Sequence, residues 1–312
     1  MLYEFDARAW GLSRKIPDEF EKLSLIETLD LGQNNFHSLP SSFKGLSFLK
    51  KLSLPNCTEL TSLPSLPSSL IELNAENCYA LETIHNMSNL ESLEELKLTN
   101  CEKVADIPGL KCLKSLRRMY LSGCNACSSQ VALRNFQNLS MPGTKLPEWF
   151  SGETVSFSKL ENIELTSVVV GVIFSFNHNN KNIQESEVFD VQANVLKSGK
   201  LTLSSGLYIG GVPRTDEPHI YLGSYHDYHA LVSHLKNADT VSVTKRSPPF
   251  DERLELIKCR IHLIFEGDDD YEGDEESLDK GLQSVSERMA RFLNTCDEGV
   301  DATESEDECH DE

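Results

Sequence analysis

The stretch LKKLSLPNCTELTSLPSLPSSL, residues 49–70, places leucines at Leu49, Leu52 and Leu54 and then a cysteine, Cys57, where a polar loop residue is expected. The arrangement recurs as IETLDLGQN, LKKLSLPNC, LIELNAENC, LEELKLTNC and LRRMYLSGC, and a degenerate earlier copy reads LYEFDARAW. The shared pattern is L-x-x-L-x-L-x-x-N/C. A repeat of about 20 to 29 residues with this pattern is the signature of leucine-rich repeats.

The last position of the pattern predicts a structural, inward-facing side chain. It is filled by Asn34, Cys57, Cys78, Cys101 and Cys124. Each copy is expected to add one short strand to a curved parallel sheet, with its alternating leucines packed on the neighbouring coil. The N/C side chain then hydrogen-bonds backbone groups that would otherwise be buried unpaired. Cys124 and Cys127 form a CNAC pair, but a second pair at metal-binding spacing is missing, so we expect no zinc site.

Length and composition limit the class of protein. The chain has 312 residues, 39% of them hydrophobic, which allows roughly two domains. It has no apolar run of about 18 residues and no apolar segment typical of a secretory signal, so we expect neither a membrane helix nor export. The nine cysteines are an odd number, which favours a reducing compartment over a disulfide framework.

The negative charge is concentrated near the C-terminus. Residues 266–312 hold 19 Asp and Glu against three Lys and Arg, and therefore carry −16 of the net charge of −20. We expect an acidic, largely disordered tail over residues 268–312, with a short amphipathic helix over 277–293. The apolar residues that indicate this helix are Leu278, Leu282, Val285, Met289 and Phe292. Because the body of the chain is not basic either, we expect no nucleic-acid partner and no membrane partner.

A second region follows the repeats. Residues 127–140 are predicted to be a linker, and about seven β-like runs then follow, separated by turn signals such as NHNNKN and RTDEP. Short strands without long helices between them indicate an antiparallel sandwich. The predicted fold class is an α/β-type leucine-rich-repeat solenoid of about six repeats over residues 1–126, followed by an all-β antiparallel sandwich over residues 141–267.

The repeats also carry a family resemblance. LPSSFKGLSFLKKLSLPNC and LPSLPSSLIELNAENCYALETI resemble the C-terminal repeats of plant intracellular TIR-NBS-LRR disease-resistance proteins. MPGTKLPEWFSGE, residues 141–153, resembles the entry into the family's C-terminal jelly-roll and Ig-like domain, and RIHLIFEGD, residues 260–268, resembles its closing strand. The resemblance covers residues 1 to about 268. It implies a role in defence and a cytoplasmic, also nuclear, location.

The catalytic parts of that family have no counterpart here. Nothing resembles its NAD-cleaving TIR domain, and the phosphate-binding pattern G-x-x-x-x-G-K-[ST] is absent from the chain. The clustered histidines, His219, His226, His229 and His234, match no metal-binding motif. We therefore expect no enzyme activity, no cofactor and no metal. We also expect a fragment or a truncated product, since the chain begins inside a repeat, and oligomers only within a full-length receptor.

The outward strand positions predict a protein-binding surface. Curvature gives a repeat array a concave face, and mixed charges suit a selective interface, although a merely solvated face is the alternative. The candidate residues are Asp30, Gln33, Lys51, Asn74, Glu76, Lys97, Arg118 and Tyr120. Arg and Tyr are among the residue types that dominate binding energies. By resemblance, the partner is a pathogen effector or a guarded host protein, and loops of the sandwich share in the contact.

Other functions remain open at this point. One is an extracellular repeat receptor or a secreted inhibitor, in which the sequons at Asn56, Asn86 and Asn138 would carry glycans. Another is a truncated adaptor or decoy. The mixed repeat spacing of 21 and 23 residues and the N/C position favour the intracellular class over the regular, about 24-residue extracellular unit.

Overall fold

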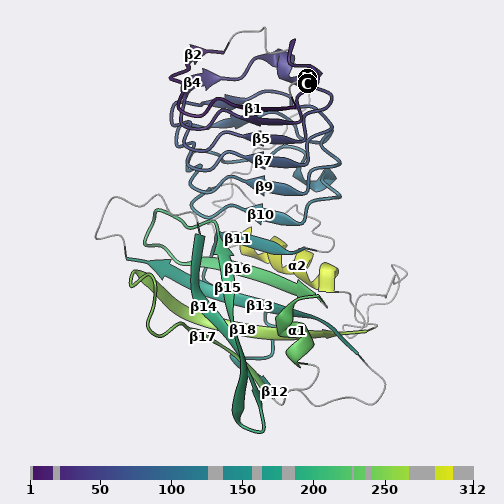
Figure 1. Ribbon diagram of the computed structural model, residues 1–312, viewed down its shortest axis with the longest axis vertical. Coiled ribbons are helices and arrows are strands. Elements are labelled where there is room, and N and C mark those ends of the chain that lie inside the picture. The colour runs from purple at the N-terminus through teal and green to yellow at the C-terminus, as the bar shows by residue number, and fades with distance from the viewer. Residues whose placement is uncertain are drawn as a thin grey trace, which may run out of the picture.

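The computed structural model describes residues 3–16, 22–125, 136–156, 164–177, 187–226, 228–235, 240–266 and 285–297. In this part, a stack of coils is followed by a broader β-region along the longest axis of the molecule (Figure 1). Most of the predicted linker, and the acidic tail except for one helix, lie outside the described residues. No described helix is long and apolar enough to cross a membrane.

Each coil contributes one strand to a parallel sheet. The strands are β1 (Glu4–Asp6), β3 (Thr28–Asp30), β5 (Lys51–Ser53), β7 (Glu72–Asn74), β9 (Glu95–Lys97) and β10 (Arg118–Tyr120). Their register places Leu29 beside Leu52, and Leu73 beside Leu96. These leucines are at most 1% exposed, so the repeated leucine becomes a continuous core. The predicted solenoid stacking is confirmed.

The remainder of each coil is short. Four small strands form a second parallel sheet: β2 (Ser13–Lys15), β4 (Asn35–Ser38), β6 (Ser62–Leu63) and β8 (Thr83–Ile84). Two single-turn 3-10 helices, η2 (Ser41–Gly45) and η3 (Leu110–Cys112), complete the described coils. Pro40 precedes η2 with an extended backbone, at φ −62° and ψ 146°, and its ring fixes the first of these angles. Prolines in these segments keep the back of the coil from forming long helices.

One residue in a left-handed conformation follows each strand, directly before the N/C position. These residues are Gln33, Asn56, Asn77, Asn100 and Gly123, with φ between 57° and 69°. Asn and Gly tolerate this conformation best among the amino acids. The backbone N–H groups of Asn56, Asn77 and Asn100 each donate to a carbonyl oxygen of the next coil at 2.8 Å. Asn56, considered above as a glycan acceptor, therefore has a structural role in the turn.

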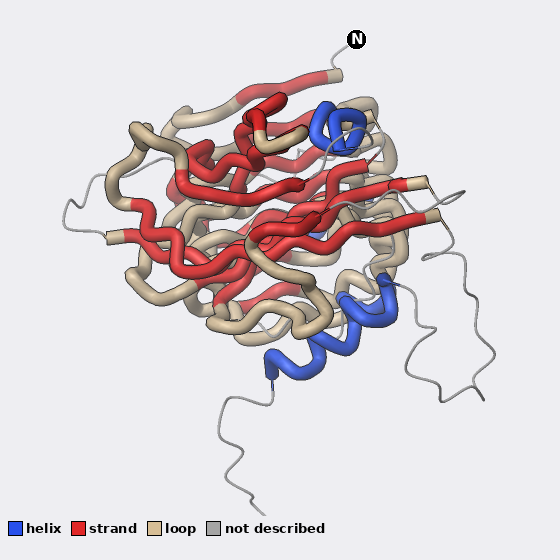
Figure 2. Tube along the Cα trace, turned by 90° about the horizontal axis from the view of Figure 1, so that it is seen from below, coloured by secondary structure: helices blue, strands red, loops and turns tan. Residues whose placement is uncertain are grey.

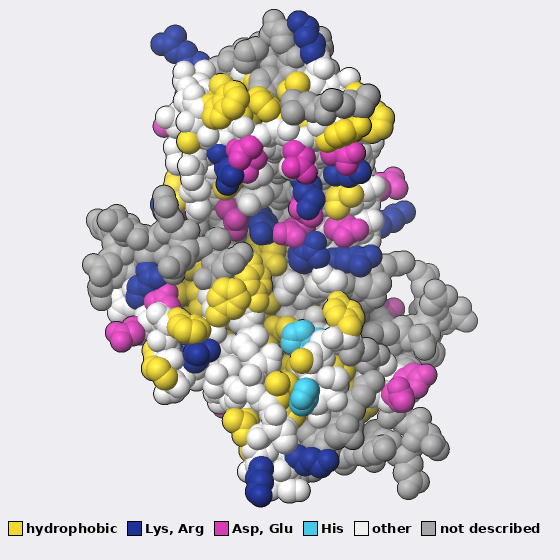
Figure 3. Space-filling view, viewed as in Figure 1, with side chains coloured by type: hydrophobic (Ala, Val, Ile, Leu, Met, Phe, Trp, Pro, Cys, Tyr) yellow, Lys and Arg dark blue, Asp and Glu magenta, His cyan; other side chains and the backbone are white. Residues whose placement is uncertain are grey.

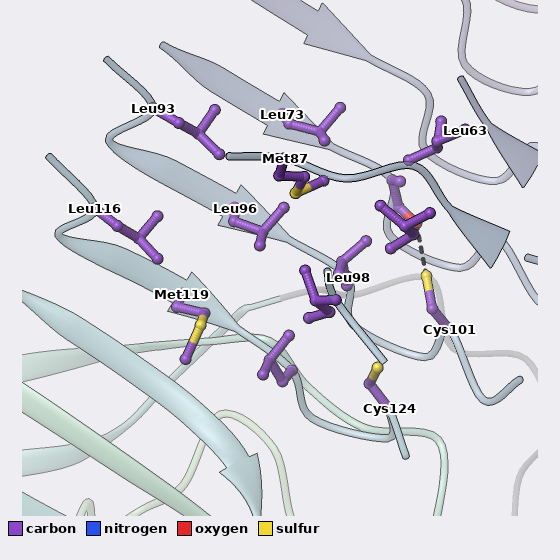
Figure 4. Close-up of a cluster of buried hydrophobic side chains, with 14 of the residues drawn as sticks. Leu63, Leu73, Met87, Leu93, Leu96, Leu98, Cys101, Leu116, Met119 and Cys124 are labelled. Carbon is purple, nitrogen blue, oxygen red and sulfur yellow. Dashed lines mark hydrogen bonds between the residues drawn. The ribbon is translucent and has the colours of Figure 1, made fainter. Parts of the chain in front are cut away.

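The N/C side chain ties each coil to the one before it. The thiols of Cys57, Cys78 and Cys101 donate to backbone carbonyl oxygens of the preceding coil at 3.3, 3.2 and 3.1 Å. Figure 4 shows the bond from Cys101 among the stacked leucines. Asn34 makes more bonds: its amide nitrogen donates to the carbonyl oxygen of Ala7 at 2.9 Å, and its Oδ1 accepts from a backbone N–H at 3.0 Å.

Cys124 is buried in the same position, and its thiol lies 3.8 Å from the carbonyl oxygen of Val104 in the preceding coil. Burial raises the pKa of the Cys57 thiol to about 11 and raises the pKa of Cys78 and Cys101 as well. Buried thiols of this kind are poor nucleophiles at neutral pH. The structure thus places the four repeat cysteines as packing and hydrogen-bonding groups.

The parallel sheet extends past the predicted repeats. Strand β11 (Asn138–Pro142) pairs in parallel with β10, with Leu139 opposite Met119. On its other side β11 pairs in antiparallel with β16 (His219–His226), which is followed by β13 (Leu165–Phe176) and β18 (Leu254–Phe265). Residues 138–140, which the sequence assigned to a linker, therefore lie in a strand, and one ten-stranded sheet joins both regions.

A second, four-stranded sheet faces this one. It consists of β12 (Thr154–Ser156), β17 (Thr240–Lys245), β14 (Glu187–Lys197) and β15 (Lys200–Gly210), all antiparallel. Buried side chains from β13, β16 and β18 join those of β14, β15, β17 and the short helix α1 (Ala230–Leu235) in one hydrophobic cluster. Seen from below, strands fill the middle of the molecule (Figure 2). The jelly-roll and Ig-like assignment stays a prediction.

The described helix of the acidic tail is α2 (Val285–Asp297). It overlaps the predicted helix 277–293 but continues to Asp297, and residues 277–284 lie outside the described part. Met289 and Leu293 are fully buried, and Phe292 packs beside them on the same side of the helix.

We predict that the repeat thiols resist alkylation in the native protein. Cys57, Cys78 and Cys101 should react with iodoacetamide only after unfolding, because their pKa values are raised by burial, whereas the partly exposed Cys112 should react in the native protein. Peptide mapping by mass spectrometry, with and without denaturant, measures this. Native labelling of the three thiols as fast as that of Cys112 would contradict the structural assignment.

Candidate functional site

The outward side chains of β1, β3, β5, β7, β9 and β10 form a surface that we call the strand face. In β3, β5, β7 and β9 these side chains flank a buried leucine of their own strand, as Lys51 and Ser53 flank Leu52. Basic and acidic side chains alternate over these strands (Figure 3). The face is therefore polar and mixed in charge, as the sequence predicted.

At the N-terminal end of the face, Arg8 pairs with two carboxylates. Its guanidinium lies 2.7 Å from Asp6 and 3.5 Å from Asp30. The hydrogen bonds from Arg8 lower the pKa of Asp6. Because all three side chains are at least partly exposed to solvent, the pairing orders the surface more than it stabilises the fold.

In the middle of the face, Lys51 of β5 and Glu72 of β7 form an ion pair across neighbouring strands at 2.8 Å. Half of the Lys51 side chain and a third of the Glu72 side chain are exposed. An exposed pair of this kind contributes about 0 to 1 kcal/mol to stability. A partner protein is thus able to form an ion pair with Lys51 or Glu72 in place of their mutual pair, with little loss in the stability of the fold.

A network of four side chains lies on and beside β9 and β10. Glu95 lies 3.1 Å from Lys97 and 2.5 Å from Arg118, and Arg118 also donates to the side-chain oxygen of Gln137 at 2.7 Å. Burial acts to raise the pKa of Glu95, but the bonds and charges of Arg118 and Lys97 outweigh it and lower the pKa. These side chains are less exposed than the Lys51 pair and more firmly held.

Two predicted contact residues act within the fold instead. Glu76 is only 7% exposed, and its backbone N–H and carboxylate bond the amide of Asn74 at 2.9 and 3.2 Å. Tyr120 is 3% exposed, because the backbone at Gly210 and Gly211 packs on it. The expectation that Glu76 and Tyr120 lie open to a partner is wrong. Gln33 is exposed, in the left-handed turn after β3.

The segment after β15 closes the C-terminal end of the strand face. The side-chain oxygen of Asn100 accepts the N–H of Arg214 at 2.8 Å, and its amide donates to the carbonyl of Val212 at 3.3 Å. The Arg214 guanidinium stacks 4.6 Å from the centre of the Tyr79 ring. Residues more than 110 positions apart thereby fix the repeats against the post-repeat region. The open part of the strand face runs from β1 to β9.

His219 makes a further bond at this junction. Its Nε2 accepts the backbone N–H of Gly123 at 3.0 Å, and its Nδ1 lies 2.8 Å from the carbonyl oxygen of Glu217. Since Nε2 accepts, the proton sits on Nδ1 and the ring is neutral. The ring is 1% exposed, and burial lowers the pKa of His219 to about 4.

The sequon asparagines and the remaining histidines that the sequence singled out lie away from the strand face or serve in the fold. Asn138 donates from its amide to the buried Tyr221 hydroxyl, which leaves no free acceptor for a glycan, whereas Asn86 is exposed. The His229 ring contacts the tilted Tyr225 ring at 4.8 Å, and His234 Nδ1 lies 2.8 Å from the carbonyl oxygen of Ala230 in its own helix. Within the described ranges, no group of three His, Cys, Asp or Glu side chains is arranged to hold a metal ion.

The stacked coils, their leucine core and the N/C position define a leucine-rich-repeat protein. No protein-family model matches the chain. TMV resistance protein N of Nicotiana glutinosa is 46% identical over 70 residues, which are 22% of this chain and 6% of that protein. Disease resistance-like protein DSC1 of Arabidopsis thaliana is 44% identical over 72 residues, 23% of this chain and 6% of that protein.

A longer match extends over the post-repeat region. Disease resistance protein RPS4 of Arabidopsis thaliana is 24% identical over 303 residues, which cover 85% of this chain and 25% of that protein. Among solved structures, the leucine-rich repeat domain of the type III effector XCV3220 (XopL) is 22% identical, with a TM-score of 0.23, over 42% of this chain and 65% of that one.

The curated relatives are plant TIR-NBS-LRR disease-resistance proteins, so the resemblance stated from the repeats is confirmed. The chain spans a quarter or less of the length of these three relatives. Their similarity supports an immune-receptor repeat region.

We predict that Gly211→Ala loosens the junction. Gly211 has φ of +74°, and an added Cβ would lie 2.4 Å from Ser140 Oγ. Gly199→Ala is the matched control, since Gly199 has φ of +72° but open space around it. Both variants carry the backbone strain, and Gly211→Ala should lose about 1 to 3 kcal/mol more in the free energy of unfolding. Equal losses in denaturant titrations would contradict the packing described.

We also predict that acid weakens the fold through His219. Its pKa is lowered from 6.5 to about 4, so the unfolded chain binds a proton first as the pH falls. Its contribution is complete above about pH 6.5 and declines towards pH 4, by roughly 3 kcal/mol in total. His219→Gln keeps an acceptor but does not titrate. Unfolding at several pH values should show a smaller decline in this variant, and identical declines would contradict the assignment.

Proposed function

We propose that this chain is the ligand-sensing region of an intracellular plant immune receptor, located in the cytoplasm or also the nucleus. Its strand face binds a protein, either a pathogen effector or a guarded host protein. The observation that carries the proposal is the row of exposed, weakly paired charges from Arg8 to Glu72 on the open part of the face. The similarity to plant disease-resistance proteins supports the setting.

The proposed activity is binding without chemistry. The repeat thiols are buried in the core, and the clustered histidines of the sequence serve in packing and hydrogen bonding where the structure describes them. We propose that the two-sheet region is the post-repeat jelly-roll and Ig-like domain of the resembled family. Because this region is joined tightly to the repeats, the binding of a partner to the strand face would affect both regions together.

The order of charges on the strand face determines which charges a partner protein must carry on its contact surface. Lys51 and Glu72 hold their charges at the surface in a fixed order along the sheet, so a partner needs the complementary order. Exchanging the two charges in K51E/E72K keeps the net charge and the intramolecular pair but reverses the order. Because such pairs contribute little to stability, the fold should be unaffected.

The test compares this exchange with a second one away from the strand face. Lys103 and Glu82 also form an exposed pair, at 2.7 Å, so E82K/K103E is a matched control. Partners would be found by proximity labelling in infected leaf tissue and their affinities measured with purified proteins. K51E/E72K should weaken binding at least tenfold, by the scale of charge-pair changes at interfaces, while E82K/K103E leaves it unchanged. Equal effects of the two exchanges would contradict the proposal.

The proposed intracellular location leads to a further prediction. Asn86 is exposed and carries a sequon, so it would be glycosylated if the chain passed through the secretory pathway. Protein purified from plant tissue should show the unmodified mass for its Asn86 peptide. A glycan there would favour the extracellular receptor or secreted inhibitor instead.

A further inference from the structure

Three buried hydroxyl groups meet where the repeats join the post-repeat region. They belong to Thr99, which follows β9, to Ser122, which follows β10, and to Ser140 of β11. All three residues are at most 1% exposed. None of their hydroxyl oxygens forms a hydrogen bond with any residue that the structure describes. We call these three groups the junction hydroxyls.

The pairing of the strands brings the three residues together. The backbone N–H of Asn100 donates to the carbonyl oxygen of Ser122 at 2.8 Å, so Thr99 and Ser122 lie on neighbouring coils. The backbone N–H of Leu121 donates to the carbonyl oxygen of Ser140 at 2.7 Å, which places Ser140 next to the coil of Ser122 on its other side. The junction hydroxyls therefore belong to three adjacent strands of the ten-stranded sheet or to the residues just after them.

The segment after β15 covers this group. Gly211 has a left-handed backbone, and the position that a Cβ there would take lies 2.4 Å from Ser140 Oγ and 3.2 Å from Thr99 Oγ1. Two of the junction hydroxyls thus lie close to one point at the covering segment. The neighbouring Asn100 differs from them, because its side chain bonds two backbone groups of that segment directly.

A hydroxyl group that is buried without a hydrogen-bond partner loses its bonds to water on folding and gains none in return. Such groups are rare in folded proteins, and an ordered internal water commonly supplies the missing partner. A buried water forms about two to four hydrogen bonds. Three hydroxyls supply that number, and each can turn to donate or to accept.

We propose that the junction hydroxyls are a binding site for ordered water, which links the ends of β9, β10 and β11 under the segment that follows β15. The hydroxyls carry no formal charge, and hard cations are held in proteins mainly with the help of carboxylates, so the chemistry of the site favours a neutral ligand. The site is separate from the exposed part of the strand face and does not depend on the proposed function.

Removing one hydroxyl distinguishes a bound water from an unpaired group. Thr99→Val keeps the shape of its side chain, and Ser122→Ala removes one oxygen atom. If water is bound, either variant takes a partner from it and should lower Tm by about 2 to 4 °C. If the hydroxyls are unpaired, either variant removes a buried polar group that has no partner and should raise Tm. Ser92→Ala, at an exposed position, is the control and should leave Tm unchanged.

The double variant T99V/S122A tests whether two of the hydroxyls share their water. Because the first substitution already weakens the hold on the water, the second should have a smaller effect. The Tm of the double variant should therefore fall by less than the two single shifts combined. Additive shifts, or a rise in Tm in either single variant, would overturn the proposal.

A high-resolution crystal structure of the unaltered chain shows the site directly. It should contain a water oxygen about 2.5 to 3.0 Å from at least two of the three hydroxyl oxygens. Junction hydroxyls that bond only to protein groups, or to nothing, would also overturn the proposal.

Discussion

Strand β11 has neighbours of opposite direction on its two sides, and the arrangement of the whole molecule depends on this double pairing. It extends the parallel repeat sheet through β10 and begins the antiparallel sheet through β16. A solenoid otherwise ends in an open edge of unpaired backbone groups, which must be covered. Here the post-repeat region takes that place, and the leucine core continues through Leu139 to Leu222 and Ile220 of β16.

Much of the fold could be predicted because local sequence determines it. The leucine and N/C positions repeat with nearly constant spacing, and the β-like runs after residue 150 each contain a strand. Strand β11 was missed because its Leu139 follows Met119 by 20 residues, shorter than the 21 and 23 of the other copies. A signal was present in QNLSM, where an apolar residue recurs in the leucine position, but a single shortened copy is a weak pattern.

The candidate site was predicted only in part, for a different reason. Alternation along a strand identifies which side chains point outward, and Lys51, Lys97 and Asp30 do so. It does not reveal which outward side chains are then covered by distant segments. Tyr120 is buried by Gly210 and Gly211, some 90 positions later in the chain, and no periodic pattern contains that contact. The junction bonds of Asn100 and His219 escaped the sequence for the same reason.

These contacts give the strand face its properties. Its charges are held by pairs that contribute little stability, so they are available to a partner, while the junction fixes the sheet that carries them. Energetic coupling between the repeats and the post-repeat region requires a connecting element that does not move separately from either region. The double pairing of β11 provides such a connection between the repeats and the post-repeat region.

The most direct test of this account is thermal unfolding followed by calorimetry and by hydrogen exchange of β11. The account predicts one cooperative transition, with β11 amides protected as long as those of β9. Two separate transitions, with β11 amides exchanging before either, would contradict it, because the two regions would then be independent bodies joined by a linker.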